Sequence, residues 1–105
     1  MEIDSLTNPS LMVPTDSIPA YCQRNGIRRL SLFGSALRQD FRSDSDVDLL
    51  VDFQPDAGVG FLALARMQRE LSDLFHRKVD LVPRSGLKTQ IRWSVLNDAE
   101  DLYAE

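Results

Sequence analysis

Three stretches of the chain have the apolar and polar pattern of β-strands. The first spans residues 27–33 and is ended by Gly34, and the second spans residues 47–53, with its odd-numbered residues forming one apolar face. A third, shorter strand is expected over residues 79–82, closed by Pro83.

The segments between these strands have apolar residues at helical spacing. A helix is expected to begin within residues 15–19 and to stop near Gly26, and a longer one is expected from about residue 61 to 75. The apolar positions of the longer helix are Phe61, Leu64, Met67, Leu71, Leu74 and Phe75. We also expect a short helix over residues 35–38, a last amphipathic helix over residues 87–96 and a short tail element around Leu102-Tyr103.

Alternating helices and strands predict an α/β (α+β) fold, a small mixed sheet of about three to four strands covered by helices. The 105 residues suit one domain. Residues 1–12 are mostly polar and contain a proline, so we expect a loose N-terminal lead-in followed by a domain over residues 13–105.

Composition narrows the classes of partner and compartment. The net charge is −4 and the pI about 4.9, and basic clusters are interleaved with acids, which argues against nucleic acid as the main partner. Cys22 is the single cysteine, which excludes an internal disulfide, and we expect it to be half-buried on a helix. No apolar run approaches the ~20 residues that span a membrane, and the first residues lack a signal-peptide pattern, so we predict a cytoplasmic protein without membrane contact.

Carboxylates at alternate positions of the predicted strands are the strongest chemical signal. Asp46 and Asp48 are two residues apart, so both side chains point to the same face of their strand. Asp80 occupies the matching position in the third strand, and pairing of the two strands would bring the three acids together. Such crowding costs stability unless a cation is bound, and it suits magnesium ions that hold a phosphoryl group. The alternative is that these acids are solvent-facing positions on half-buried strands.

Gly34 and Ser35 stand where a strand gives way to a helix. Glycine allows the backbone to approach a phosphate closely, and the exposed amides of a helix N-terminus attract an anion. An ordinary strand-to-helix turn, with serine as the cap, would have the same pattern.

Together these residues form a Gly-Ser pair, ten intervening residues and Asp-x-Asp, with apolar runs before Gly34 and after Asp48. The pattern strongly resembles the DNA polymerase β-like nucleotidyltransferase superfamily. More narrowly, it resembles the minimal nucleotidyltransferase (MNT) antitoxins of HEPN–MNT toxin–antitoxin systems. The resemblance covers roughly residues 18–96 and adds the minimal nucleotidyltransferase fold to our expectations.

The resemblance implies a role for each matching residue. Gly34 and Ser35 would hold the triphosphate, and Asp46, Asp48 and Asp80 would bind magnesium, with two ions expected.

The family often has an arginine–glycine pair soon after the Gly-Ser pair. Here Arg38 matches the arginine, and Gln39 replaces the glycine. Arg38 is therefore a candidate phosphate ligand, or it pairs with Asp40 or Asp44 instead.

The expected activity is magnesium-dependent transfer of a nucleoside monophosphate, AMP from ATP, to a hydroxyl of a partner protein. A chain of this length has little room for a separate acceptor-binding domain, so we expect the acceptor to be presented by another molecule. The resemblance implies that this partner is a cognate HEPN-domain RNase toxin and that the chain is its antitoxin. The alternative is a non-catalytic antitoxin that neutralises its toxin by masking a surface.

Overall fold

The computed structural model of the chain describes residues 13–34, 46–86 and 98–105. The elements in these ranges are, in order, α1 (Ile18–Arg24), β1 (Ile27–Phe33), β2 (Val47–Phe53), α2 (Phe61–Phe75), β3 (Val79–Pro83), the 3-10 turn η2 (Arg84–Gly86) and β4 (Glu100–Ala104). The expected bounds of β1, β2 and α2 are confirmed, and β3 runs one residue further than expected, through Pro83.

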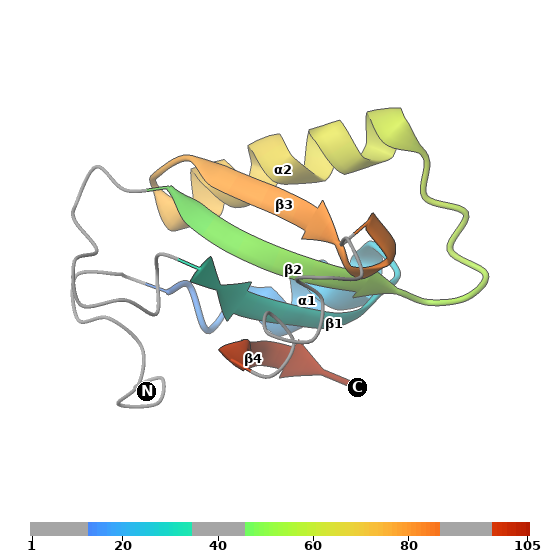
Figure 1. Cartoon of the computed structure of the whole chain (residues 1–105), viewed down its shortest axis with the longest axis horizontal. Helices are drawn as coiled ribbons and strands as arrows, with labels where there is room; N and C mark the ends of the chain where they lie inside the picture. The colour runs from blue at the N-terminus through green and yellow to red at the C-terminus, as the bar shows by residue number, and fades with distance from the viewer. Residues whose placement is uncertain (1–12, 35–45, 87–97) are drawn as a thin grey trace.

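The strands form one mixed sheet in the order β3-β2-β1-β4 (Figure 1). β1 pairs antiparallel with both β2 and β4, whereas β2 and β3 are parallel. Because two parallel strands need a long crossover connection, α2 leads from the end of β2 back to the start of β3. The expected mixed sheet of three to four strands is confirmed.

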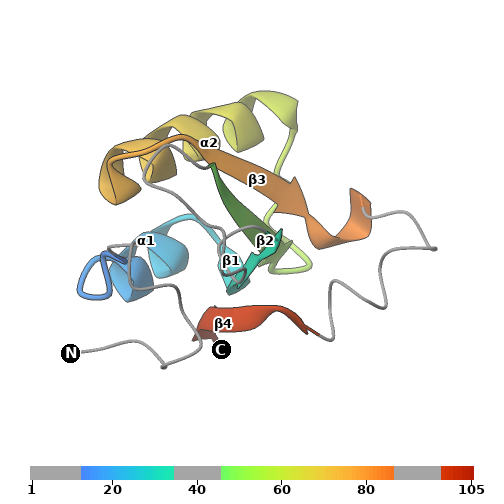
Figure 2. The ribbon, with the colours of Figure 1, turned by 60° about the vertical axis from the view of Figure 1, so that its left-hand side comes forward.

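Both helices share one hydrophobic core with one face of the sheet (Figure 2). The buried residues of the core are Ile18, Tyr21, Cys22, Ile27, Leu30, Leu32, Val47, Leu49, Val51, Met67, Leu71, Phe75, Val79 and Leu81. Strand residues alternate between faces, so every second residue of β2 and β3 points away from the helices. This second face carries the polar side chains considered next and is called the open face.

Helix α1 begins from a turn rather than from a side-chain cap. Ser17 occupies the N-cap position, but its side chain makes no capping hydrogen bond; instead the Pro14 carbonyl accepts from the backbone N–H groups of Ser17 and Ile18. The start of the helix lies within the predicted residues 15–19, without a side-chain cap at Ser17. The helix ends as predicted, because Gly26 adopts a left-handed φ of 68°.

Two burial expectations need correction. Cys22 was expected to be half-buried, but it is fully buried, and this burial raises the pKa of its thiol to about 12. Phe61 was expected on the apolar face of α2, yet it is 89% exposed. At 100° per residue, Phe61 lies roughly 80° from the direction of Leu71, at the margin of the apolar stripe and in the first turn. Leu62, on the opposite side, is 88% exposed.

The tail element becomes the edge strand β4, in which Tyr103 lies opposite Leu30 of β1. The expected lead-in of residues 1–12, the helix over 35–38 and the helix over 87–96 lie outside the described residues and stay predictions. No helix within the described ranges has the length and apolar character needed to cross a membrane.

Candidate functional site

The register of β2 and β3 brings two of the predicted acids face to face. Asp48 and Asp80 are Cα partners in the parallel ladder, one row along from the buried pair Val47 and Val79. Since the valines point into the core, both carboxylates point to the open face. Partners on adjacent strands lie about 5 Å apart, so the two charges repel each other unless a cation lies between them.

Gly34 lies against Asp48 on the side away from Asp80. It follows β1, whose last residue, Phe33, is the antiparallel partner of Asp48. Its φ is 69°, and a Cβ atom added to Gly34 would lie 2.5 Å from Oδ2 of Asp48. A side chain at this position would displace the Asp48 carboxylate, so the glycine allows the backbone to approach the acids closely.

Asp46 lies just before β2 at the same end of the sheet. Its Oδ2 is 3.8 Å from Nζ of Lys78, and the backbone N–H of Val47 donates to the Lys78 carbonyl at 2.9 Å. The remaining predicted site residues, Ser35 and Arg38, lie outside the described residues.

The donor chemistry of these residues fits magnesium. Mg²⁺ takes hard oxygen ligands and commonly needs only one or two carboxylates beside substrate phosphates, which Asp48 and Asp80 can supply from facing positions. Within the part of the chain that the structure describes, no three acidic, histidine or cysteine side chains converge closely enough to hold a metal by themselves.

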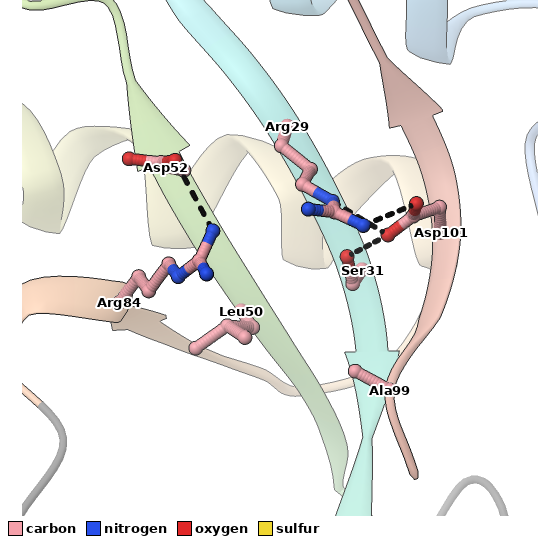
Figure 3. Close-up of a pocket in the computed structure, with 7 residues that line it drawn as sticks. All are labelled: Arg29, Ser31, Leu50, Asp52, Arg84, Ala99 and Asp101. Atoms are coloured by element: carbon pink, nitrogen blue, oxygen red, sulfur yellow. Dashed lines mark hydrogen bonds and ion pairs between the residues drawn. The ribbon is translucent and has the colours of Figure 1, made fainter. Parts of the chain in front are cut away.

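A cavity of about 70 Å³ lies further along the same face (Figure 3). Its lining residues are Arg29, Ser31, Leu50, Asp52, Arg84, Ala99 and Asp101. Leu50 and Asp52 are two and four residues beyond Asp48 on β2, so the cavity continues the face that carries the acids.

The charged residues of this cavity pair with one another. The Arg29 guanidinium donates to both carboxylate oxygens of Asp101, from Nε at 3.0 Å and from Nη2 at 2.9 Å, and the Ser31 hydroxyl donates to Asp101 at 2.6 Å. Arg84 lies 3.6 Å from Asp52, which also pairs with Arg28. The hydrogen bond from Arg29 holds the pKa of the Asp101 carboxyl below its usual range. The contacts of Arg29 and Ser31 with Asp101 tie β4 to β1, and no local pattern could predict them, because they join residues 72 and 70 positions apart.

The chain belongs to the nucleotidyltransferase domain family, whose model matches residues 17–102. It is 38% identical over 76 residues to the protein adenylyltransferase MntA of Thermococcus cleftensis. The matched region covers 72% of this chain and 75% of that protein. The resemblance inferred from the Gly-Ser and Asp-x-Asp residues is confirmed.

Solved structures share the fold. A protein assigned as a minimal nucleotidyltransferase gives a TM-score of 0.69 at 35% identity, over 84% of this chain and 94% of its own. A chain of a toxin–antitoxin complex with AMP-PNP gives a TM-score of 0.71 at 22% identity, over 87% of this chain and 73% of that chain. A chain of the complex between a tri-AMPylated Shewanella oneidensis HEPN toxin and an MNT antitoxin gives a TM-score of 0.64 at 21% identity, over 88% of this chain and 71% of that chain. The first match confirms the minimal nucleotidyltransferase fold.

Proposed function

We propose that this nucleotidyltransferase transfers AMP from ATP to a hydroxyl of a partner protein and acts as the antitoxin of a HEPN-domain toxin. Its relative from Thermococcus cleftensis is named a protein adenylyltransferase, and proteins of the same fold have been solved in toxin–antitoxin complexes. The proposal places the reaction in the cytoplasm.

The facing carboxylates of Asp48 and Asp80, with Gly34 packed against Asp48, are the observation that carries this proposal. A sheet built for stability alone would gain nothing from opposing two like charges. Carboxylates opposed beside a glycine backbone suit a magnesium-bound triphosphate, because the backbone amides and the cation both attract the phosphates.

Each residue has a defined task in the proposed reaction. Asp46 and Asp48 would hold magnesium on the triphosphate, while Gly34, with the predicted Ser35 and Arg38, would bind its phosphates. Bound magnesium, two ions in our proposal, would neutralise the charge that develops on the phosphates.

Asp80 would position the incoming hydroxyl, whose proton is released to solvent in the reaction. The acceptor oxygen forms a bond to the α-phosphorus as the bond from that phosphorus to the bridging oxygen breaks, and pyrophosphate leaves. Most of the rate gain would come from positioning and charge neutralisation.

A label-transfer assay tests the proposal. The full chain is incubated with α-labelled ATP, Mg²⁺ and the HEPN-domain protein encoded beside it, and labelled toxin is measured. We expect Asp48→Asn and Asp80→Asn to lower transfer by about 100-fold or more, since each removes a charge that the reaction needs. Asp73→Asn is the matched control, because Asp73 is an exposed carboxylate on α2, away from the open face. Transfer that survives Asp48→Asn would rule out this site as the centre of the reaction.

Masking without catalysis is the second candidate, and the exposed pair Phe61 and Leu62 favours it. These side chains are 89% and 88% exposed and follow the loop at the far end of β2, roughly 20 Å along the strand from the acids. Adjacent exposed apolar residues are a common feature of docking surfaces. Masking predicts that the toxin is neutralised without ATP, that Asp48→Asn still neutralises it and that Phe61→Ser does not. Neutralisation that requires ATP and the Asp48 carboxylate excludes masking.

A further inference from the structure

Lys78 is fixed beside the acids by the backbone of the sheet. Its carbonyl accepts the Val47 N–H at 2.9 Å, immediately before the row in which Val47 and Val79 are partners. Lys78 is therefore level with Asp46, as Asp80 is level with Asp48. The open face thus carries an acid opposite an acid in one row and a lysine opposite an acid in the next.

The position of Lys78 in the strand order places it across the acids from Gly34. The sheet runs β3-β2-β1, so Lys78 lies just before β3, Asp46 and Asp48 at the start of β2, and Gly34 just after β1. Because β2 lies between them, β3 and β1 are separated by two strand spacings, about 10 Å. An anion above the β2 acids would therefore have glycine backbone on one side and a lysine ammonium on the other.

The contact between Lys78 and Asp46 is weak enough for other ligands to replace it. The atoms are 3.8 Å apart, and the two side chains are 75% and 50% exposed. An exposed ion pair at this distance contributes little stability. A cation that binds the carboxylate, or a phosphate that binds the ammonium, can therefore replace it at low cost.

We propose that Lys78 is a triphosphate-binding residue that changes partners. It pairs with Asp46 when no cation is bound there, and it turns to the phosphates of a nucleoside triphosphate once Asp46 coordinates a divalent cation. The inference rests on the proposed nucleotidyltransferase function of the same site and adds a positive group to the phosphate ligands predicted from the sequence.

This exchange has opposite effects on two binding equilibria. Replacing Lys78 by glutamine removes the ammonium that competes for Asp46, so the site should bind Mn²⁺ alone about 3-fold more tightly. The same substitution removes a ligand of the triphosphate, so Mg²⁺–ATP should bind about 5- to 10-fold more weakly. If Lys78 served only the structure of the turn before β3, its substitution would not change the binding of Mn²⁺ and of Mg²⁺–ATP in opposite directions.

The experiment titrates the full chain with Mn²⁺, followed by electron paramagnetic resonance, and with Mg²⁺–ATP, followed by calorimetry. Lys78→Gln should shift the two dissociation constants in opposite directions, and Lys78→Arg should keep both near those of the wild type. Arg24→Gln is the control, since Arg24 ends α1, beside the start of β1 and so at the far end of the sheet, and its loss changes the net charge equally. Circular dichroism confirms that each variant is folded.

Two failures are distinguishable. If the wild type binds Mg²⁺–ATP but Lys78→Gln leaves both constants unchanged, or moves them in the same direction, Lys78 does not exchange partners. If the wild type itself binds no Mg²⁺–ATP, the proposed function fails, and this inference fails with it.

Discussion

Replacing Gly34 by alanine tests the close approach of backbone and carboxylate. Gly34 has a φ of 69°, and the new methyl carbon would lie 2.5 Å from Oδ2 and 3.3 Å from Cγ of Asp48. The left-handed conformation costs a residue with a side chain about 1–2 kcal/mol. Moving the Asp48 carboxylate off its preferred rotamer adds about 0.5–1.5 kcal/mol. The free energy of unfolding should fall by roughly 2 kcal/mol, which lowers Tm by about 10 °C in a domain of this size.

The effect of this substitution on catalysis should exceed its effect on stability. The carboxylate must move by nearly 1 Å to clear the methyl group, and a misplacement of about 1 Å at a reacting centre can cost about 100-fold in rate. AMP transfer to the toxin, measured well below the Tm of the variant, should fall by about that factor. Urea denaturation of the same preparation gives the stability.

Gly58→Ala is the matched control. Gly58 has a φ of 62°, and a Cβ atom there would meet nothing within 4 Å. This variant carries the backbone strain alone, about 1 kcal/mol, and should transfer AMP at the wild-type rate. If Gly34→Ala is as active as Gly58→Ala, the contact of Gly34 with Asp48 has no part in the reaction and the reasoning fails.

Three further predictions concern charge and exposure. Asp80→Asn should stabilise the chain in EDTA by about 0.5 kcal/mol, because Asp48 loses a like charge across the ladder; lower stability in urea denaturation would contradict this. Asp101, with its pKa lowered by Arg29, contributes stability above its unfolded pKa and loses it as pH falls through the folded pKa. The gap in stability between wild type and Asp101→Asn, about 0.5 kcal/mol at neutral pH, should therefore shrink below about pH 4, and a gap that grows on acidification would refute the pairing. Phe61→Ser should change the free energy of unfolding by less than about 0.5 kcal/mol, since the side chain is 89% exposed; a larger loss in thermal unfolding would mean that it packs in solution.

Local patterns in the sequence were enough to predict which face of each strand carries the acids. Val47 and Leu49 alternate with Asp46 and Asp48, and the same alternation recurs around Asp80, so the faces of both strands follow from the period of two. What remained was the assumption that the two strands are neighbours, and the parallel ladder confirms it.

Contacts between distant segments could not be predicted in the same way. The pairing of Arg29 with Asp101 depends on β4 returning to the edge of the sheet, and the short run Glu100–Ala104 carries too few apolar residues to distinguish a strand from another tail element. In the sequence, Lys78 is not distinguished from the neighbouring basic residue Arg77. Its position level with Asp46 follows only from the register of β2 and β3.

The pairing of charges along the open face supports a functional origin for the acids. Toward the far end of β2, Arg29 is the ladder partner of Asp52, which forms ion pairs with Arg28 and Arg84. The same sheet therefore opposes unlike charges where they only hold strands together. At the other end, Asp48 is opposed by Asp80, which costs stability when no cation is bound. Arginines balance the charge of Asp52, whereas the position opposite Asp48 holds a second aspartate, which suits a ligand that needs both carboxylates.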